Sequence, residues 1–80
     1  MTYQEQRAFR LRVGAALRAR REARGETATM VAKRIGIARP NYTRMERGVC
    51  MARIETVVRA ARALGCRPLD VLAEALEGIE

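Results

Sequence analysis

The chain has 80 residues, about the size of one small domain, and 49% of them are hydrophobic, mostly Ala, Val, Leu and Ile without any Trp, a mixture that favours helices. With no His and only Cys50 and Cys66, it lacks the usual ligand set of a zinc site and the usual nucleophile and base pairs of an enzyme. The sequence therefore predicts a non-enzyme without metal or cofactor. Because no apolar run is long enough for a signal peptide or a membrane span, it also predicts a cytoplasmic protein.

The formal net charge of +7 is unevenly placed along the chain. Residues 1–67 hold all 16 Lys and Arg residues against five acids, a net charge of +11, whereas residues 68–80 hold four acids and no cation, a net charge of −4. Fifteen of the 16 cations are Arg, whose planar guanidinium suits two-pronged binding of phosphate or guanine. The excess indicates a polyanionic partner, although Arg-rich codon usage is the alternative source.

Glycines and prolines divide the chain into five segments of helical length with apolar residues three or four apart. The first predicted helix covers about residues 4–24, with Gly25 just beyond its end. The second opens after Thr27 as N-cap and closes before Gly36; Met30 stands where a capping-box Glu would be better. The inward faces of these two helices are predicted to be Phe9, Val13, Ala16 and Leu17, and Val31, Ala32 and Ile35.

The third predicted helix covers about residues 40–47. Pro40 fits only the first turn, so Arg39 is predicted to be the N-cap or to come just before it. Tyr42 and Met45 are predicted to face the core, although the Tyr hydroxyl also has the reach for a phosphate. The outward-facing residues of this helix are predicted to be Asn41, Thr43 and Arg44.

Two further helices are predicted over residues 53–64 and 68–77. The first should end before Gly65, and the second should begin at Pro68, a favoured first position of a helix. Their apolar stripes are predicted to be Ile54, Val57, Ala61 and Leu64, and Leu69, Leu72, Leu76 and Ile79.

The second and third helices meet at Gly36 and Ile37, and this turn length is typical of a helix-turn-helix motif. The motif covers about residues 27–48. The whole chain, residues 1–80, is predicted to be a single all-α domain. Four stretches carry a likeness to a known family: residues 17–25, 31–37, 45–48 and 61–69. Through them the sequence resembles the phage-repressor family of helix-turn-helix proteins, the Cro and xenobiotic-response-element type, over about residues 13–72. The resemblance implies a compact five-helix, lambda-repressor-like fold and sequence-specific binding of double-stranded DNA by a transcriptional regulator.

The resemblance also implies roles for individual residues. Those expected to contact bases are Arg39, Asn41, Thr43 and Arg44, and those expected to hold phosphates are Thr27, Arg47 and Arg53. Arg21 and Glu46 match an ion pair that ties the first helix to the third. The chain departs from the family pattern at Ala28, where Gln is frequent, at Ala38, where Ser often caps the third helix, and at Arg20, where Leu is common.

A homodimer is predicted because the core is short and because Leu72, Leu76 and Ile79 extend the apolar stripe of the last helix. A two-fold dimer predicts an operator that is an inverted repeat. One alternative is an antitoxin that uses the same DNA-binding core and neutralises a protein partner. A basic amphipathic helix at a membrane surface is less favoured, since its stripe lacks aromatic anchors. Cys50 and Cys66 fit ordinary thiols better than oxidant sensors.

Overall fold

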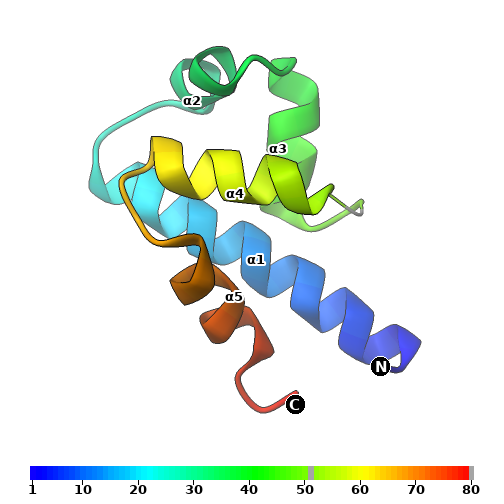
Figure 1. Ribbon diagram of the computed structural model, residues 1–80. Coiled ribbons are helices and arrows are strands. Elements are labelled where there is room, and N and C mark those ends of the chain that lie inside the picture. Colours follow the sequence, from blue (N-terminus) through cyan, green and yellow to red (C-terminus); the bar gives the residue numbers. More distant parts are fainter. Residues whose placement is uncertain (51, 80) are drawn as a thin grey trace.

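Residues 1–50 and 52–79, the part of the chain that the computed structural model describes, form five helices and no strand (Figure 1). The molecule measures 33 × 21 × 19 Å. The all-α, five-helix prediction is confirmed. The helices are α1 (Tyr3–Ala23), α2 (Ala28–Ile35), α3 (Arg39–Arg47), α4 (Ile54–Ala63) and α5 (Pro68–Leu76). None of the helices in the described part is long and apolar enough to cross a membrane.

The long helix α1 is the support for the rest of the fold and packs against α3 and α5. It begins one residue earlier than the sequence predicts, because Thr2 and Glu5 form a capping box. The Glu5 amide donates to Thr2 Oγ1 at 3.1 Å, and the Thr2 amide donates to Glu5 Oε1 at 2.8 Å. The predicted inward face of α1 is correct: Val13, Ala16 and Leu17 are buried and Phe9 is partly buried against them.

The helices α2 and α3 form the helix-turn-helix pair. Thr27 caps α2 as predicted, and the Thr27 amide donates weakly to the Met30 sulfur at 3.5 Å, in place of the carboxylate of a capping box. Gly36 ends α2 with φ at +73°, a conformation that favours glycine. The N-cap of α3 is Ala38 rather than Arg39, because the extended backbone ends at Ala38 and Pro40 is accommodated at the second helical position.

The core lies where α1, α2, α3 and α4 meet, and α5 closes it by packing against α1 and α4. Its largest fully buried side chains are Tyr42, Leu17, Val31 and Val71. The backbones of α1 and α3 touch directly: a Cβ at Gly14 would lie 2.2 Å from the Glu46 carbonyl oxygen. A Cβ at Gly48 would lie 2.7 Å from the Leu11 Cα. These two glycines therefore set the distance between the two helices.

The apolar stripes predicted for the last two helices need correction. Ile54 is 58% exposed and Leu69 is 65% exposed. In α5 the residues that face the core are Val71 and Ala75, about 100° around the helix from the predicted stripe, which leaves Leu69 on the far side. Ile54 lies one turn before the buried Val57, at the start of α4, where the core opens to solvent.

Candidate nucleic-acid interface

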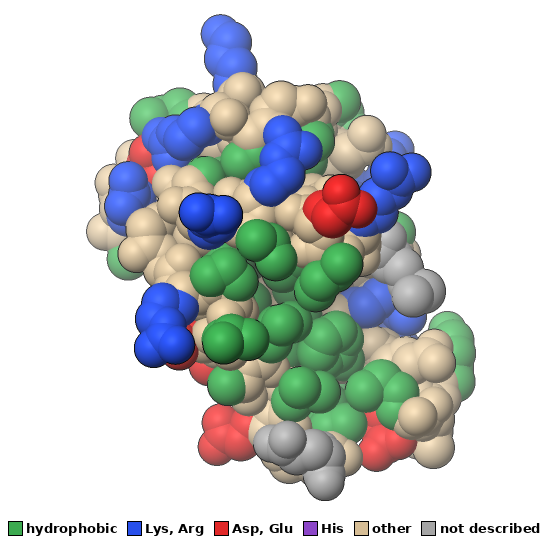
Figure 2. All heavy atoms as spheres, viewed as in Figure 1, with side chains coloured by type: hydrophobic (Ala, Val, Ile, Leu, Met, Phe, Trp, Pro, Cys, Tyr) green, Lys and Arg blue, Asp and Glu red, His purple; other side chains and the backbone are tan. Residues whose placement is uncertain are grey.

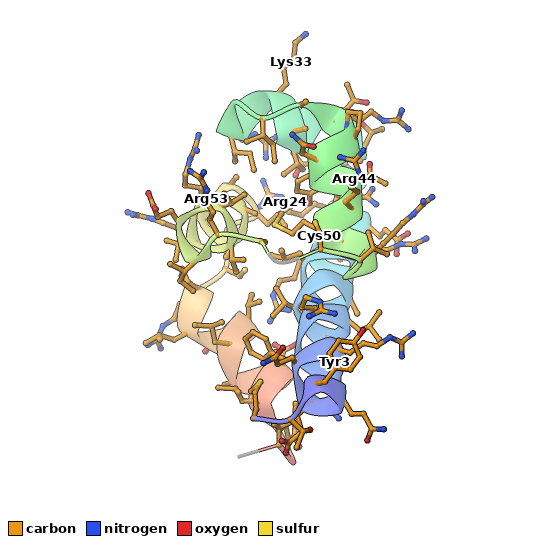
Figure 3. All side chains as sticks on the ribbon, turned by 90° about the vertical axis from the view of Figure 1, so that its right-hand side faces the viewer. Tyr3, Arg24, Lys33, Arg44, Cys50 and Arg53 are labelled. Carbon is orange, nitrogen blue, oxygen red and sulfur yellow. The ribbon has the colours of Figure 1, made fainter. Side chains whose placement is uncertain are left out.

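The outer surface of α3 carries the residues expected to contact bases. Arg39, Asn41 and Arg44 are exposed and Thr43 is half-buried. Figure 3 looks onto this side of the molecule, with Arg44 on α3 and Arg53 at the start of α4. Arg44 Nη1 donates a hydrogen bond to Asn41 Oδ1 at 2.8 Å. Two of the four side chains are therefore joined to each other on the helix surface.

A basic concavity of about 510 Å³ lies between α3 and α4 beside this surface. Asn41, Arg44 and Arg53 border it, so the structure brings together two of the expected base-contacting residues and one of the expected phosphate-holding residues. Arg53 occupies the N-cap position of α4, and its side chain makes no capping hydrogen bond. A phosphate at this rim would meet the cation together with the positive end of the α4 dipole.

Thr56 and Arg59 also line the concavity, and sequence reasoning did not identify them. They follow Arg53 at intervals of three residues, a spacing that puts the three side chains on one side of α4. The guanidinium of Arg59 additionally donates to the Ile35 carbonyl oxygen at the end of α2. Arg59 therefore links the helix-turn-helix pair to α4 while facing the same concavity.

The other two residues expected to hold phosphates lie apart from this concavity. Arg47 is the exposed last residue of α3, just before Gly48. Thr27 precedes α2, and its hydroxyl already accepts a hydrogen bond from the Met30 amide at 3.2 Å. A hydroxyl in that state can still donate to a phosphate oxygen. Thr27, Arg47 and Arg53 therefore come from three places: the start of α2, the end of α3 and the start of α4.

The ion pair implied between Arg21 and Glu46 is present beneath the surface of α3. Arg21 Nε and Nη2 donate to the two carboxylate oxygens of Glu46 at 2.8 and 2.9 Å, and the side chains are only 15% and 6% exposed. Hydrogen bonding to Glu46 raises the pKa of Arg21. Burial, followed by the nearby Glu46 carboxylate, raises the pKa of Tyr42, whose hydroxyl is buried. Tyr42 therefore acts as a core residue and does not reach outward.

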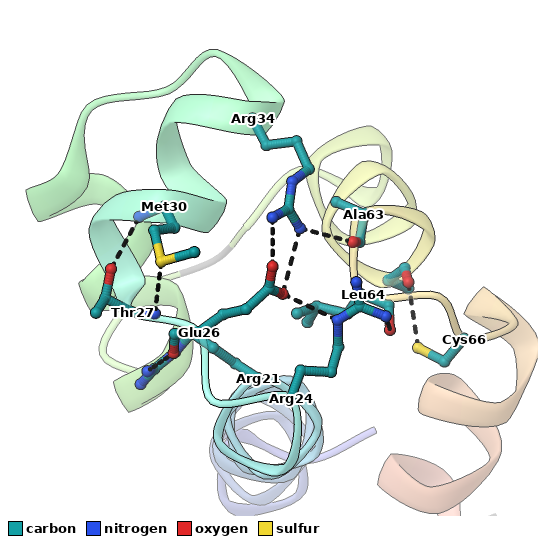
Figure 4. Close-up of polar contacts among 10 residues, drawn as sticks. Arg21, Arg24, Glu26, Thr27, Met30, Arg34, Ala63, Leu64 and Cys66 are labelled. Carbon is teal, nitrogen blue, oxygen red and sulfur yellow. Dashed lines mark hydrogen bonds and ion pairs between the residues drawn. The ribbon is translucent and has the colours of Figure 1, made fainter.

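Several other arginines form structural contacts. Glu26 accepts hydrogen bonds from Arg24 and Arg34, and these two guanidiniums also donate to the Leu64 and Ala63 carbonyl oxygens at the end of α4 (Figure 4). The hydrogen bonds from Arg34 and Arg24 lower the pKa of Glu26 from 4.5 to about 2. This cluster joins the end of α1, the start of the helix-turn-helix and the end of α4.

Two arginines of α1 also form contacts within the fold. Arg20, which departs from the family pattern, pairs with Glu74 of α5, and this hydrogen bond raises the pKa of Arg20 and lowers the pKa of Glu74. Arg12 Nη1 donates to the Glu77 carbonyl oxygen at 2.5 Å. These cations fasten α5 to α1, so the acidic end of the chain offsets part of the positive charge away from α3.

Among residues 1–50 and 52–79, no group of three His, Cys, Asp or Glu side chains is arranged to hold a metal ion. The side chains that are exposed on α3 and at the start of α4 are instead those that pair with phosphate oxygens and base edges.

Comparison with known proteins supports this assignment. A family model described as a helix-turn-helix domain matches residues 12–76. A search of curated proteins and a search of solved structures gave no match. The match starts within α1 and ends with α5, so it includes the helix-turn-helix pair and both elements that support it. The chain belongs to the helix-turn-helix domain family of DNA-binding proteins.

Proposed function

We propose that this protein is a sequence-specific regulator of transcription of the Cro and xenobiotic-response-element type, which acts by binding double-stranded DNA and without catalysis or cofactor. The observation that carries the proposal is the outer face of α3. Its Arg39, Asn41 and Arg44 side chains are exposed, whereas the opposite face supplies Tyr42, Met45 and Glu46 to the interior. A helix with this division can enter the major groove without disturbing the fold.

In the proposed complex, base contacts come from α3. The Arg44 guanidinium offers two parallel donors to O6 and N7 of a guanine, and Asn41 beside it offers an amide to a neighbouring base or to Arg44 itself. Arg39 and Thr43 extend the same surface to adjacent base pairs. Thr27, Arg47 and Arg53 hold the backbone on either side and fix the register of α3 in the groove.

The proposed functional unit is a homodimer on an inverted repeat. One α3 reads only a few base pairs, and a two-fold pair of domains places two such helices about one helical turn apart, ~34 Å. Doubling the contact surface supplies the affinity and selectivity that one domain of this size lacks.

Selection of bound sites from random duplex DNA tests the proposal directly. We expect an enriched inverted repeat with two equal half-sites, and we expect enrichment to disappear for the double variant R39A/R44A. Because both side chains are exposed, this variant should keep the far-UV circular dichroism spectrum of the wild type. Recovery of random sequences by the wild-type protein would contradict sequence-specific binding.

A further inference from the structure

An apolar groove runs between α1, α4 and α5 and adjoins the concavity beside α3, with which it shares Met45, Cys50 and Ala52. It has a volume of about 520 Å³, and its walls include Phe9, Val13, Val57, Leu72 and Leu76. Figure 2 shows hydrophobic side chains gathered on this face, with cations concentrated above them. Phe9, Leu72 and Leu76 are only half-buried. An exposed apolar surface of this kind usually marks a contact with another molecule.

Two features at and beside the groove are suited to opposite halves of a contact. Ile54 lines the groove and is 58% exposed, and the acid Glu55, which follows it on α4 outside the lining, is also exposed. Across the groove, Arg10 of α1 contributes a guanidinium whose Nε is buried and finds no hydrogen-bond partner among the described residues. The face thus presents an exposed apolar side chain next to an acid, and an apolar groove lined by an arginine whose Nε has no hydrogen-bond partner among the described residues.

A surface that offers both halves is complementary to a second copy of itself. In a two-fold dimer each contact occurs twice, so Ile54 of each protomer can enter the groove of the other while Glu55 meets Arg10. The charge pattern distinguishes this occupant from an arbitrary apolar peptide, which would supply nothing for Arg10.

The direction of the groove is compatible with such a dimer on DNA. Apolar side chains gather on the face that Figure 2 shows, and α3 with Arg44 faces the viewer in Figure 3, after a turn of 90°. Two copies joined through the groove face therefore can lie side by side with both α3 helices on one common side, as a linear duplex requires.

We propose that the groove between α1, α4 and α5 is the surface through which two copies of this chain associate, with Ile54 as its central apolar contact and Arg10 with Glu55 as its intermolecular ion pair. The inference rests on the proposed function for its two-fold arrangement. It also revises the sequence prediction: Leu72 and Leu76 take part as walls of the groove, together with residues of α1 and α4 that the sequence assigned to the core, while Ile79 does not line it.

Sedimentation equilibrium of three proteins over a concentration series tests the apolar contact. I54D is expected to raise the dimer dissociation constant at least about tenfold, because it places a charge in a desolvated contact. L69D is the matched control, since Leu69 is 65% exposed on α5 and does not line the groove. Wild-type affinity in I54D, or a weakened dimer in L69D but not in I54D, would overturn the proposal, as would a wild-type protein that stays monomeric throughout the series and on DNA.

Charge reversal tests the ion pair, and recovery of affinity in the double variant would show that the single variants are not simply misfolded. R10E and E55R should each weaken the dimer, and the double variant R10E/E55R should recover much of the affinity, because it restores opposite charges. Failure of the double variant to recover affinity would refute the Arg10–Glu55 pairing.

Binding of the same variants to one half-site separates this inference from the proposed function. If the dimer surface is correct, I54D still prefers the selected half-site over scrambled DNA, but lacks the added affinity for the complete inverted repeat. If every protein, including the wild type, fails to discriminate between DNA sequences, the proposed function fails, whatever the oligomeric state.

Discussion

Arg21 and Glu46 join α1 to α3 through a bidentate ion pair that is almost completely shielded from solvent. The same guanidinium donates from Nη1 to the Glu26 carbonyl oxygen at 2.9 Å, so it also fixes the segment that leads into α2. One side chain of α1 therefore positions both ends of the helix-turn-helix pair.

Removing Glu46 should destabilise the fold strongly. In E46A the Arg21 charge stays in place without its carboxylate, and removal of one partner of a buried pair costs about 3–5 kcal/mol. Urea denaturation measures this change in the free energy of unfolding. E22A is the control, because the Arg18–Glu22 pair is 60% and 56% exposed and such pairs contribute no more than about 1 kcal/mol. Equal stabilities of the two variants would show that the Arg21–Glu46 pair contributes no more than a surface contact.

G14A should lower stability although alanine favours helices. In an unobstructed helix, Gly to Ala gains about 1 kcal/mol, but here the new Cβ would lie 2.2 Å from the Glu46 carbonyl oxygen. Forcing α1 and α3 apart should cost about 1–3 kcal/mol net, as overpacking does elsewhere. Thermal denaturation of G14A beside A15G, at the exposed neighbouring position, separates packing from propensity. A stabilised G14A would contradict the close contact of the two helices.

The helix boundaries could be predicted from the sequence, whereas the packing at Gly14 could not. Helix boundaries were predictable within one or two residues because Thr27, Gly36 and Pro68 act through local backbone chemistry. A glycine inside a helix carries no comparable local signal, since its role depends on a backbone that passes nearby from α3. Exposure of Ile54 and Leu69 was likewise missed, because periodicity gives a helix face but not which residues along it meet a neighbour.

Acid should weaken the Glu26 cluster over a defined pH range. The pKa of Glu26 is about 2 in the folded protein, below its ordinary value of 4.5. A lowered pKa stabilises the folded state at pH values above the ordinary pKa of the carboxyl group. This contribution is lost as the pH falls from about 4.5 toward 2. The stability gap between wild type and E26Q should therefore be largest near neutral pH and close over that range. Urea midpoints across the pH series measure it; a gap that is constant with pH would refute the assigned role of the carboxylate.

Replacing Arg44 and replacing Arg47 should have different effects on DNA binding. R44A should cost about 1–3 kcal/mol on the selected site and relax preference at one base pair. R47A should weaken all sequences alike and reduce the salt slope by about one unit for each phosphate interaction that the substitution removes. Titrations with the selected and scrambled duplexes at several salt concentrations compare the two. An equal decrease in affinity for both duplexes in R44A would assign Arg44 to the phosphates.

Asn41 should act partly through Arg44. The hydrogen bond between them holds the guanidinium in one orientation, so N41A is expected to broaden preference at the base pair that depends on Arg44. A double-mutant cycle with R44A gives the coupling between the two side chains, expected at about 0.5 kcal/mol or more for residues in contact. Strictly additive effects would mean that Asn41 and Arg44 contact DNA independently.

Residues in the helix-turn-helix motif were predictable as candidates, but their grouping was not. The resemblance assigns Asn41, Arg44 and Arg53 to contacts with DNA, whereas the inclusion of Thr56 and Arg59 in the same concavity depends on how α4 packs against α2. The contacts of Arg24 and Arg34 could not be predicted from the sequence either. Both guanidiniums donate to carbonyl groups at the end of α4, which are 40 and 29 residues away in sequence. A composition rich in arginine does not reveal which guanidiniums are engaged inside the fold.

The direct contact of backbones at Gly14 and Gly48 has a consequence for the duplex. No side chain lies between α1 and α3 at these two positions to change rotamer, so rolling or tilting α3 against α1 would bring the two backbones into collision. Fitting α3 to an imperfect groove should then rely more on bending or twisting of the DNA, whose cost depends on base sequence. The preferred operator should accordingly include flexible or narrow-grooved steps at positions that no side chain reaches.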